Sequence, residues 1–200
     1  MGRALFKPFT RHCLLATFLF LVIACSPKLN WRTVQSPEQR YAALFPGKPD
    51  KLERQTSFGD QELRQTLEAV KIDDDIYSIS TIALPAKQFN PELVQKITKQ
   101  LQSNLLDRAK ASDGSVIAEP AFFKNSQHQR FQTEDYYILF NVASKTQQAM
   151  RVRWIVRTND DGNVLIYQIS VLHTNANTGD AKKRLSQEEY ANFFNEFYPE

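Results

Sequence analysis

The chain of 200 residues carries 25 basic and 22 acidic side chains. Three of the basic ones (Arg3, Lys7 and Arg11) lie in the first 24 residues, so residues 25–200 carry 22 of each sign. A segment balanced in this way lacks the electrostatic footprint of a nucleic-acid binder, and no nucleic-acid partner is expected. Its 176 residues suit one domain with a substantial core.

Residues 1–24 have the layout of a secretory signal peptide. The basic start contains no acidic residue, and it is followed by the apolar run Leu14–Ala24, which is eleven residues long. A membrane-spanning helix needs about 20 apolar residues to cross a hydrocarbon core of about 30 Å, so this run is too short to be a stable anchor. We therefore expect it to be cleaved.

The residues before Cys25 resemble the bacterial lipobox. Val22, Ile23 and Ala24 provide a branched, a tolerated and a small residue, with valine in place of the commoner leucine at the first position. The resemblance implies that Cys25 bears the lipid as the first mature residue; the alternative is cleavage nearby by an ordinary signal peptidase. Cys13 lies inside the signal, so lipidation also explains a single mature cysteine without a disulfide partner.

Ser26 after the modified cysteine implies, by the same resemblance, sorting to the outer membrane of a double-membraned bacterium. Residues 25–30 would form a lipidated tether to a single domain over residues 31–200. At roughly 3.5 Å per extended residue, this tether holds the domain within about 20 Å of its anchor. The expected location is the periplasmic side of the outer membrane.

The first half of the domain is predicted to be a series of strands. A Ser36-Pro37 turn separates the first two, and Pro46-Gly47-Lys48-Pro49 ends the second. The corner Asp73-Asp74-Asp75 is interpreted as solvated, because it lacks the spacing, glycine and distal glutamate of an EF-hand loop. The predicted strands are Trp31–Val34, Tyr41–Phe45, Gln55–Phe58, Glu62–Ile72 and Ile76–Leu84.

Asn90 and Pro91 are typical of a helix start, with an N-cap and a first-turn proline. The predicted helix runs to about Ala111, before an Asp113-Gly114 stop. Its apolar residues follow the spacing of a face laid on a sheet. They are Val94, Ile97, Leu101, Leu105 and Ala109.

Four further strands and a closing helix are predicted after residue 114. The segment Asn159-Asp160-Asp161-Gly162 is a good hairpin signal between the last two strands. Ser186 and Glu189 have the spacing of a capping box, and aromatic residues from Tyr190 to Tyr198 follow helical spacing, which indicates a core-facing helix. The predicted strands are Val116–Phe123, Tyr136–Ala143, Met150–Arg157 and Val164–His173.

This order of elements predicts an α+β fold, an antiparallel sheet of about six to eight strands with two main helices packed on it. The stretch from Val34 through Pro49, with Ser36-Pro37 and Phe45-Pro46-Gly47, resembles the opening of small bacterial envelope proteins of the PsbP-like α/β/α sandwich class. The closing helix Tyr190–Tyr198 is also similar to theirs. The resemblance implies a scaffold for protein contacts, and it carries no catalytic motif to these positions.

The sequence shows no catalytic constellation, metal site or cofactor motif, so we do not expect an enzyme. His128 and His173 have no metal-ligand neighbour at short spacing, and a zinc site needs three or four ligands. His173 is in phase with the buried face of a strand, whereas His128 is interpreted as a surface residue. The sequence also has no glycine-rich phosphate loop and no G-x-S-x-G nucleophile elbow.

Arg151, Arg153 and Arg157 alternate with apolar residues along one predicted strand. Because Trp154 should lie inside, the three arginines should share the outer face. One interpretation is a solvated face paired with carboxylates such as Glu62, Glu68, Glu134 or Asp135. The other is a stripe that binds an anionic partner, either lipid headgroups or an acidic protein, through the planar fork of arginine.

The leading hypothesis is a lipid-anchored periplasmic binding or accessory protein that contacts other envelope proteins. The first alternative is a carrier or sensor of a small apolar or lipidic ligand held between sheet and helix, which an apolar pocket with a few polar groups would favour. A cell-envelope hydrolase is the third, and it requires titratable groups that converge in a cleft. The membrane, through the lipid on Cys25, is the one partner that the sequence specifies.

Overall fold

The computed structural model describes residues 29–59, 61–86, 90–141, 147–175 and 180–200. The chain divides into two units, Met1–Asn30 and Trp31–Glu200, and every helix and strand described lies in the second. The predicted signal peptide and Cys25 lie outside the described residues.

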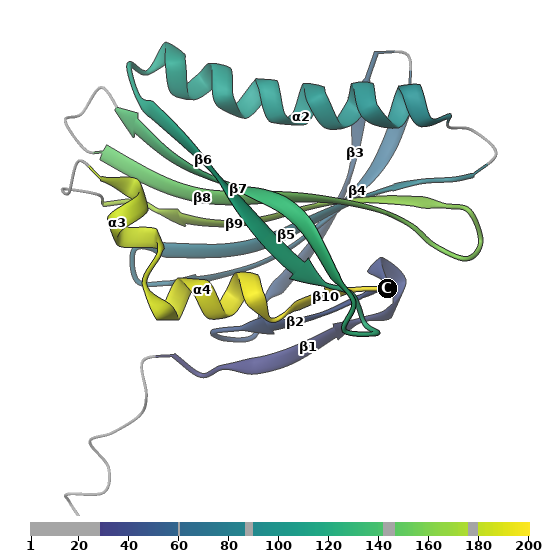
Figure 1. Cartoon of the computed structure of the whole chain (residues 1–200), viewed down its shortest axis with the longest axis horizontal. Coiled ribbons are helices and arrows are strands. Elements are labelled where there is room, and N and C mark those ends of the chain that lie inside the picture. The colour runs from purple at the N-terminus through teal and green to yellow at the C-terminus, as the bar shows by residue number, and fades with distance from the viewer. Residues whose placement is uncertain (1–28, 60, 87–89, 142–146, 176–179) are drawn as a thin grey trace, which may run out of the picture. The chain divides into compact units, whose positions relative to one another are not determined.

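Seven strands form one antiparallel sheet in the order β3-β4-β5-β9-β8-β7-β6 (Figure 1). A smaller sheet contains three strands in the order β1-β2-β10. The α+β prediction is therefore confirmed, although the first two predicted strands belong to a sheet of their own. The bounds are β1 Arg32–Ser36, β2 Tyr41–Phe45, β3 Asp50–Phe58, β4 Gln61–Ile72, β5 Asp75–Leu84, β6 Ser115–Lys124, β7 Arg130–Asn141, β8 Gln147–Thr158, β9 Val164–His173 and β10 Phe197–Pro199.

Strand β9 matches its predicted bounds, but β3 and β7 begin earlier than predicted. Strand β7 starts at Arg130 instead of Tyr136, and its first five residues alternate between exposed and half-buried side chains, all polar except Phe131, before the buried Asp135. Because five of its first six residues are polar, the apolar alternation that marks a strand is weak there, and these residues lie outside the predicted strand. The hairpin between β8 and β9 is confirmed by the Gly162 N–H, which donates to the Asn159 carbonyl at 2.9 Å.

Helix α2, Pro91–Ala111, begins and ends where the sequence predicts. The Asn90 side chain accepts a hydrogen bond from the Leu93 N–H at 2.8 Å, as an N-cap does. At the other end the Gly114 N–H donates to the Ala109 carbonyl at 2.9 Å. Gly114 also lies so close to strand β7 that a Cβ would be 1.9 Å from the Leu139 carbonyl oxygen, which explains the need for glycine there.

The closing segment differs from the predicted single helix. It contains α3 (Ala181–Leu185) and α4 (Glu188–Asn195), followed by strand β10. Ser186 is the C-cap of α3, and the N-cap of α4 is Gln187 without a side-chain hydrogen bond, so the predicted capping box is wrong. Phe197 and Tyr198 leave the helix to pair with β2. Local spacing could not reveal this pairing, because β2 lies about 150 residues earlier in the chain.

The two faces of the large sheet are covered by different elements (Figure 1). Helices α3 and α4 and strands β2 and β10 contribute to one hydrophobic cluster on the first face, together with β5, β7, β8 and β9. Helix α2 packs on the other face and forms two separate clusters, one around Val94 and Ile97 and one around Ala109. We call these the closed face and the α2 face.

Candidate functional site

The three arginines of β8 do share one strand face, but it is the closed face of the sheet. Arg151 and Arg153 are 6% and 2% exposed, so the prediction that they lie outside is wrong. Trp154 is buried as predicted, at 6% exposure, on the α2 face. The strand phase was therefore right, and the error was to assume that one face of β8 meets solvent when helices cover both.

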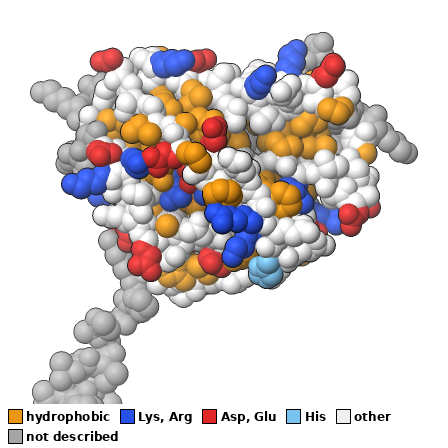
Figure 2. All heavy atoms as spheres, viewed as in Figure 1, with side chains coloured by type: hydrophobic (Ala, Val, Ile, Leu, Met, Phe, Trp, Pro, Cys, Tyr) orange, Lys and Arg blue, Asp and Glu red, His pale blue; other side chains and the backbone are white. Residues whose placement is uncertain are grey.

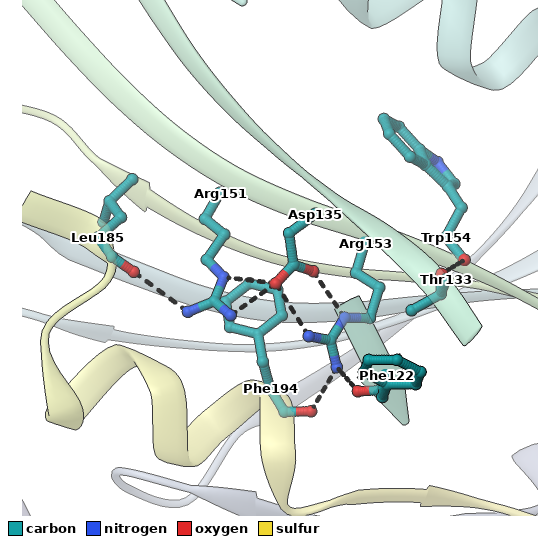
Figure 3. A network of polar contacts seen from close by, with 8 residues as sticks. All are labelled: Phe122, Thr133, Asp135, Arg151, Arg153, Trp154, Leu185 and Phe194. Atoms are coloured by element: carbon teal, nitrogen blue, oxygen red, sulfur yellow. Dashed lines mark hydrogen bonds and ion pairs between the residues drawn. The ribbon is translucent and has the colours of Figure 1, made fainter. Parts of the chain in front are cut away.

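Asp135 on β7 is the partner of both buried arginines (Figure 3). Its Oδ2 accepts from Nε and Nη2 of Arg151 at 3.1 and 2.6 Å. Nε of Arg153 donates to Oδ1 at 2.6 Å, and Nη2 of Arg153 donates to Oδ2 at 2.9 Å. One carboxylate thus binds two guanidinium groups, each through two N–H donors.

Backbone carbonyls accept the remaining inward-pointing donors of the two arginines (Figure 3). Nη1 of Arg151 donates to the Leu185 carbonyl at 3.2 Å. Nη1 of Arg153 donates to the carbonyls of Phe194 at 2.9 Å and Phe122 at 3.1 Å. Because Leu185 ends α3 and Phe194 lies in α4, the network ties both short helices to the centre of the sheet.

The charges in this network compensate one another only in part. Burial by itself raises the pKa of Asp135, but the hydrogen bonds and positive charges of Arg153 and Arg151 outweigh burial and leave the pKa below its usual value. Two positive charges and one negative charge lie below the surface, and their polar atoms are bonded within the protein. These contacts give the network a structural role and leave little access for a ligand.

Arg157, the third residue of the predicted stripe, lies apart from this network. It is half-buried, and its guanidinium carbon is 4.6 Å from the centre of the Phe131 ring. Its Nε is buried and has no hydrogen-bond partner among the described residues. The structure therefore does not present the three guanidinium groups together to an anionic partner.

His173 is buried at the end of β9, as its phase predicts, and it contacts a carboxylate. Its Nδ1 is 2.6 Å from Oδ1 of Asp75, and the Tyr190 hydroxyl donates to the other oxygen at 3.0 Å. A catalytic histidine of this kind needs a nucleophile at its second nitrogen. Here Nε2 is 2.9 Å from the Asn175 carbonyl oxygen, so the group joins β5, β9 and α4, and no nucleophile among the described residues contacts this nitrogen. Asp75 is accordingly not a purely solvated corner residue.

Two clefts border helix α2. The first, which we call the hairpin cleft, has a volume of about 730 Å³ and lies between the N-terminal half of α2 and the β8–β9 hairpin. Val94, Val156 and Val164 supply apolar lining, and Thr98 and Thr158 are among the polar residues. Val156 is 41% exposed, although it points to the same face as buried Trp154. This volume is within the range of small-molecule sites.

The second cleft, which we call the Arg108 cleft, has a volume of about 610 Å³ and borders the C-terminal half of α2. Leu105, Phe140, Met150 and Leu172 provide its apolar lining, and Arg108 stands at its α2 side. Figure 2 shows hydrophobic side chains reaching the surface near both ends of α2. The sequence contained one signal for these clefts, the narrow apolar stripe of α2, which cannot cover a sheet of seven strands.

No protein-family model matches the chain, and no curated protein matches it. Among the described residues, no helix is long and apolar enough to cross a membrane. Within the same ranges, no three His, Cys, Asp or Glu side chains are grouped so that they could hold a metal ion.

His128 is exposed and precedes β7, in agreement with its interpretation as a surface residue.

Proposed function

We propose that this protein is a lipid-anchored binding protein of the bacterial envelope, which holds the apolar part of its ligand in the hairpin cleft. The proposed attachment rests on the sequence: the signal is cleaved before Cys25, and Cys25 carries the lipid. The proposed location is the periplasmic side of the outer membrane. We also propose that the domain is an α/β/α sandwich of the PsbP-like class, which its helix, sheet and helix layers support.

The observation that carries this proposal is the exposed apolar floor of the hairpin cleft. Val156 lies on the α2 face near the end of β8, and it is 41% exposed because α2 leaves it uncovered. Apolar side chains inside a concave site with a few polar groups at its rim are typical of sites for small apolar ligands. Among the alternatives from the sequence, the carrier or sensor thus has the strongest geometric support.

Within the domain, the proposed site and the strand nearest the tether belong to different layers. The tether would enter the domain at β1, and the small sheet that contains β1 lies across the large sheet from α2 (Figure 1).

The test is binding of N-phenyl-1-naphthylamine, a neutral dye whose fluorescence rises in apolar surroundings. Val156→Trp should fill the hairpin cleft and abolish most of the rise. Val116→Trp is the matched control, because Val116 is similarly exposed at 36% but does not line either cleft. Equal dye binding by both variants would contradict the proposed site.

Attachment is tested separately by metabolic labelling with a clickable fatty acid. The unchanged chain should incorporate the label, and Cys25→Ser should remove it, because the thiol is the proposed site of lipidation. A serine variant that keeps its label would contradict the assignment of Cys25.

A second candidate function, contact with another envelope protein, is favoured by the free edge strand β6. Val116, Ile117 and Phe122 are 36%, 43% and 44% exposed on this strand, and apolar residues on a sheet edge can pair with another chain. A photo-crosslinking residue at Ile117 should then capture a defined protein in living cells. The control is Leu52 on the opposite edge strand β3, which is 60% exposed; equal capture at both edges would contradict a specific contact.

A further inference from the structure

The Arg108 cleft differs from the hairpin cleft in the charge at its rim. Arg108 is the one charged side chain among the described residues that line the Arg108 cleft. The charged side chain that lines the hairpin cleft is instead Glu92. The two clefts should therefore prefer ligands of opposite charge.

Arg108 is exposed, and its side chain has no hydrogen bond or ion pair among the described residues. The neighbouring acid on α2, Asp107, is instead paired with Lys110 at 3.6 Å. A guanidinium with five N–H donors thus stands free at the rim of the cleft. It could bind a carboxylate through two parallel hydrogen bonds.

Below Arg108 the lining is apolar but not uniformly so. The apolar lining comes from Leu105, Phe140, Met150 and Leu172. Gln168 supplies an amide whose oxygen already accepts from Trp154 Nε1 at 3.2 Å. An alkyl chain would remove these apolar surfaces from water, which favours its binding.

We propose that the Arg108 cleft binds an anionic amphiphile, with its acidic head on the Arg108 guanidinium and its alkyl chain against Leu105, Phe140, Met150 and Leu172. This inference rests on the proposed function in taking the space beside α2 as a binding site. It adds a second site and a ligand class, a fatty acid or a similar single-chain acid.

A structural alternative for Arg108 is known from helix electrostatics. A basic residue in the last turn of a helix complements the helix dipole, and both Arg108 and Lys110 lie in the last turn of α2. Only Arg108 lines the cleft, among the described residues, so Lys110→Gln is a matched control for the loss of one charge at the same helix end.

Trp154 provides the measurement, because it bonds Gln168 and packs in the same cluster as Met150. The chain has two tryptophans, and Trp31→Phe leaves Trp154 as the single fluorophore. Brominated alkyl chains quench tryptophan on close contact. The full chain should carry Cys25→Ser as well, so that its own proposed lipid cannot occupy the cleft.

Brominated fatty acid should quench Trp154 in a saturable manner, and the matching brominated alcohol should do so at least tenfold more weakly. Arg108→Gln should weaken binding of the acid by about tenfold, the size of one charge-assisted contact, and leave the alcohol unchanged. Lys110→Gln should change neither by more than about twofold. Raising the salt concentration should weaken the acid more than the alcohol.

The proposal is overturned if acid and alcohol quench equally, or if Lys110→Gln has the same effect as Arg108→Gln. The first result would leave a neutral apolar site, and the second would show a general charge effect. Absence of quenching by any chain would also overturn it. The neutral dye in the hairpin cleft tests the proposed function independently, since Val156 does not line the Arg108 cleft.

Discussion

The closed face and the α2 face of the large sheet both carry apolar side chains, but they are covered to different extents. On the closed face, two short helices and a second sheet contribute to one hydrophobic cluster, and a carboxylate and two guanidinium groups are buried on the same face. On the α2 face, a single helix crosses seven strands and forms two separate clusters with a cleft beside each half. The closed face is thus organised for stability, and the α2 face leaves apolar surface accessible for binding.

The largest loss of stability is expected from removing the buried carboxylate of Asp135 on the closed face. Asp135→Ala should lower the free energy of unfolding by about 3–5 kcal/mol, because Arg151 and Arg153 would remain buried without their counter-charge. Urea denaturation followed by fluorescence measures the loss. Glu134→Ala, on the exposed neighbour of the same strand, is the control and should cost less than about 1 kcal/mol.

Equal small losses from both variants would show that the buried arginines find other partners. Replacing Asp135, Arg151 and Arg153 together with leucine or methionine separates charge from packing. This triple variant should recover much of the lost stability if unpaired charge is the cause.

A smaller effect is expected from adjacent residues of β8 that point to opposite faces. Ile155→Ala should cost about 2–5 kcal/mol, because Ile155 is 2% exposed on the closed face and its removal leaves a cavity. Val156→Ala should change stability by less than about 1 kcal/mol, because Val156 already meets solvent in the hairpin cleft. Comparable losses in thermal unfolding would mean that the cleft is closed in solution.

The loss of stability at low pH should also arise from the closed face, through Asp135. The pKa of Asp135 is lowered in the folded state, because its arginine partners outweigh the opposing effect of burial. The ionised Asp135 carboxylate therefore contributes its full share of the folding free energy above the unfolded-state pKa of about 3.9. This contribution is lost as pH falls through the lower folded-state pKa. Wild-type stability should fall more steeply below pH 4 than that of Asp135→Asn. Parallel curves for the two proteins would contradict this assignment.

Much of the fold could be predicted because its signals are local. The cap at Asn90, the proline at the first turn and the stop near Gly114 define α2 without reference to the rest of the chain. The β8–β9 hairpin depends on a few turn residues in the same way. Strand β10 could not be predicted by this route, because its pairing with β2 is a long-range contact between segments near opposite ends of the domain.

The candidate site was predicted less well, and the arginines show why. Alternation along β8 correctly places Arg151 and Arg153 opposite Trp154, but it cannot say whether a further layer covers them. Asp135 is one of several carboxylates that could pair with these arginines, and no local pattern distinguishes it from the others. The clefts depend on where α2 crosses the sheet, and that position is set by packing between distant segments.

Removing a helix cap should have a small effect, and it tests whether α2 is held less tightly than the helices of the closed face. Asn90→Ala removes the side-chain cap on the Leu93 N–H and should cost about 1 kcal/mol of global stability, whereas Asn90→Asp should retain the cap. Asp180→Ala removes the equivalent cap of α3, on the Lys183 N–H, and is the control on the closed face. Because α2 is flanked by two clefts, hydrogen exchange should show its first turns opening locally in Asn90→Ala, by more than the global loss explains. In Asp180→Ala the amides of α3 should follow global stability, since Leu185 is fully buried and its carbonyl binds Arg151. Equal local opening of the two helices would contradict the difference between the two faces.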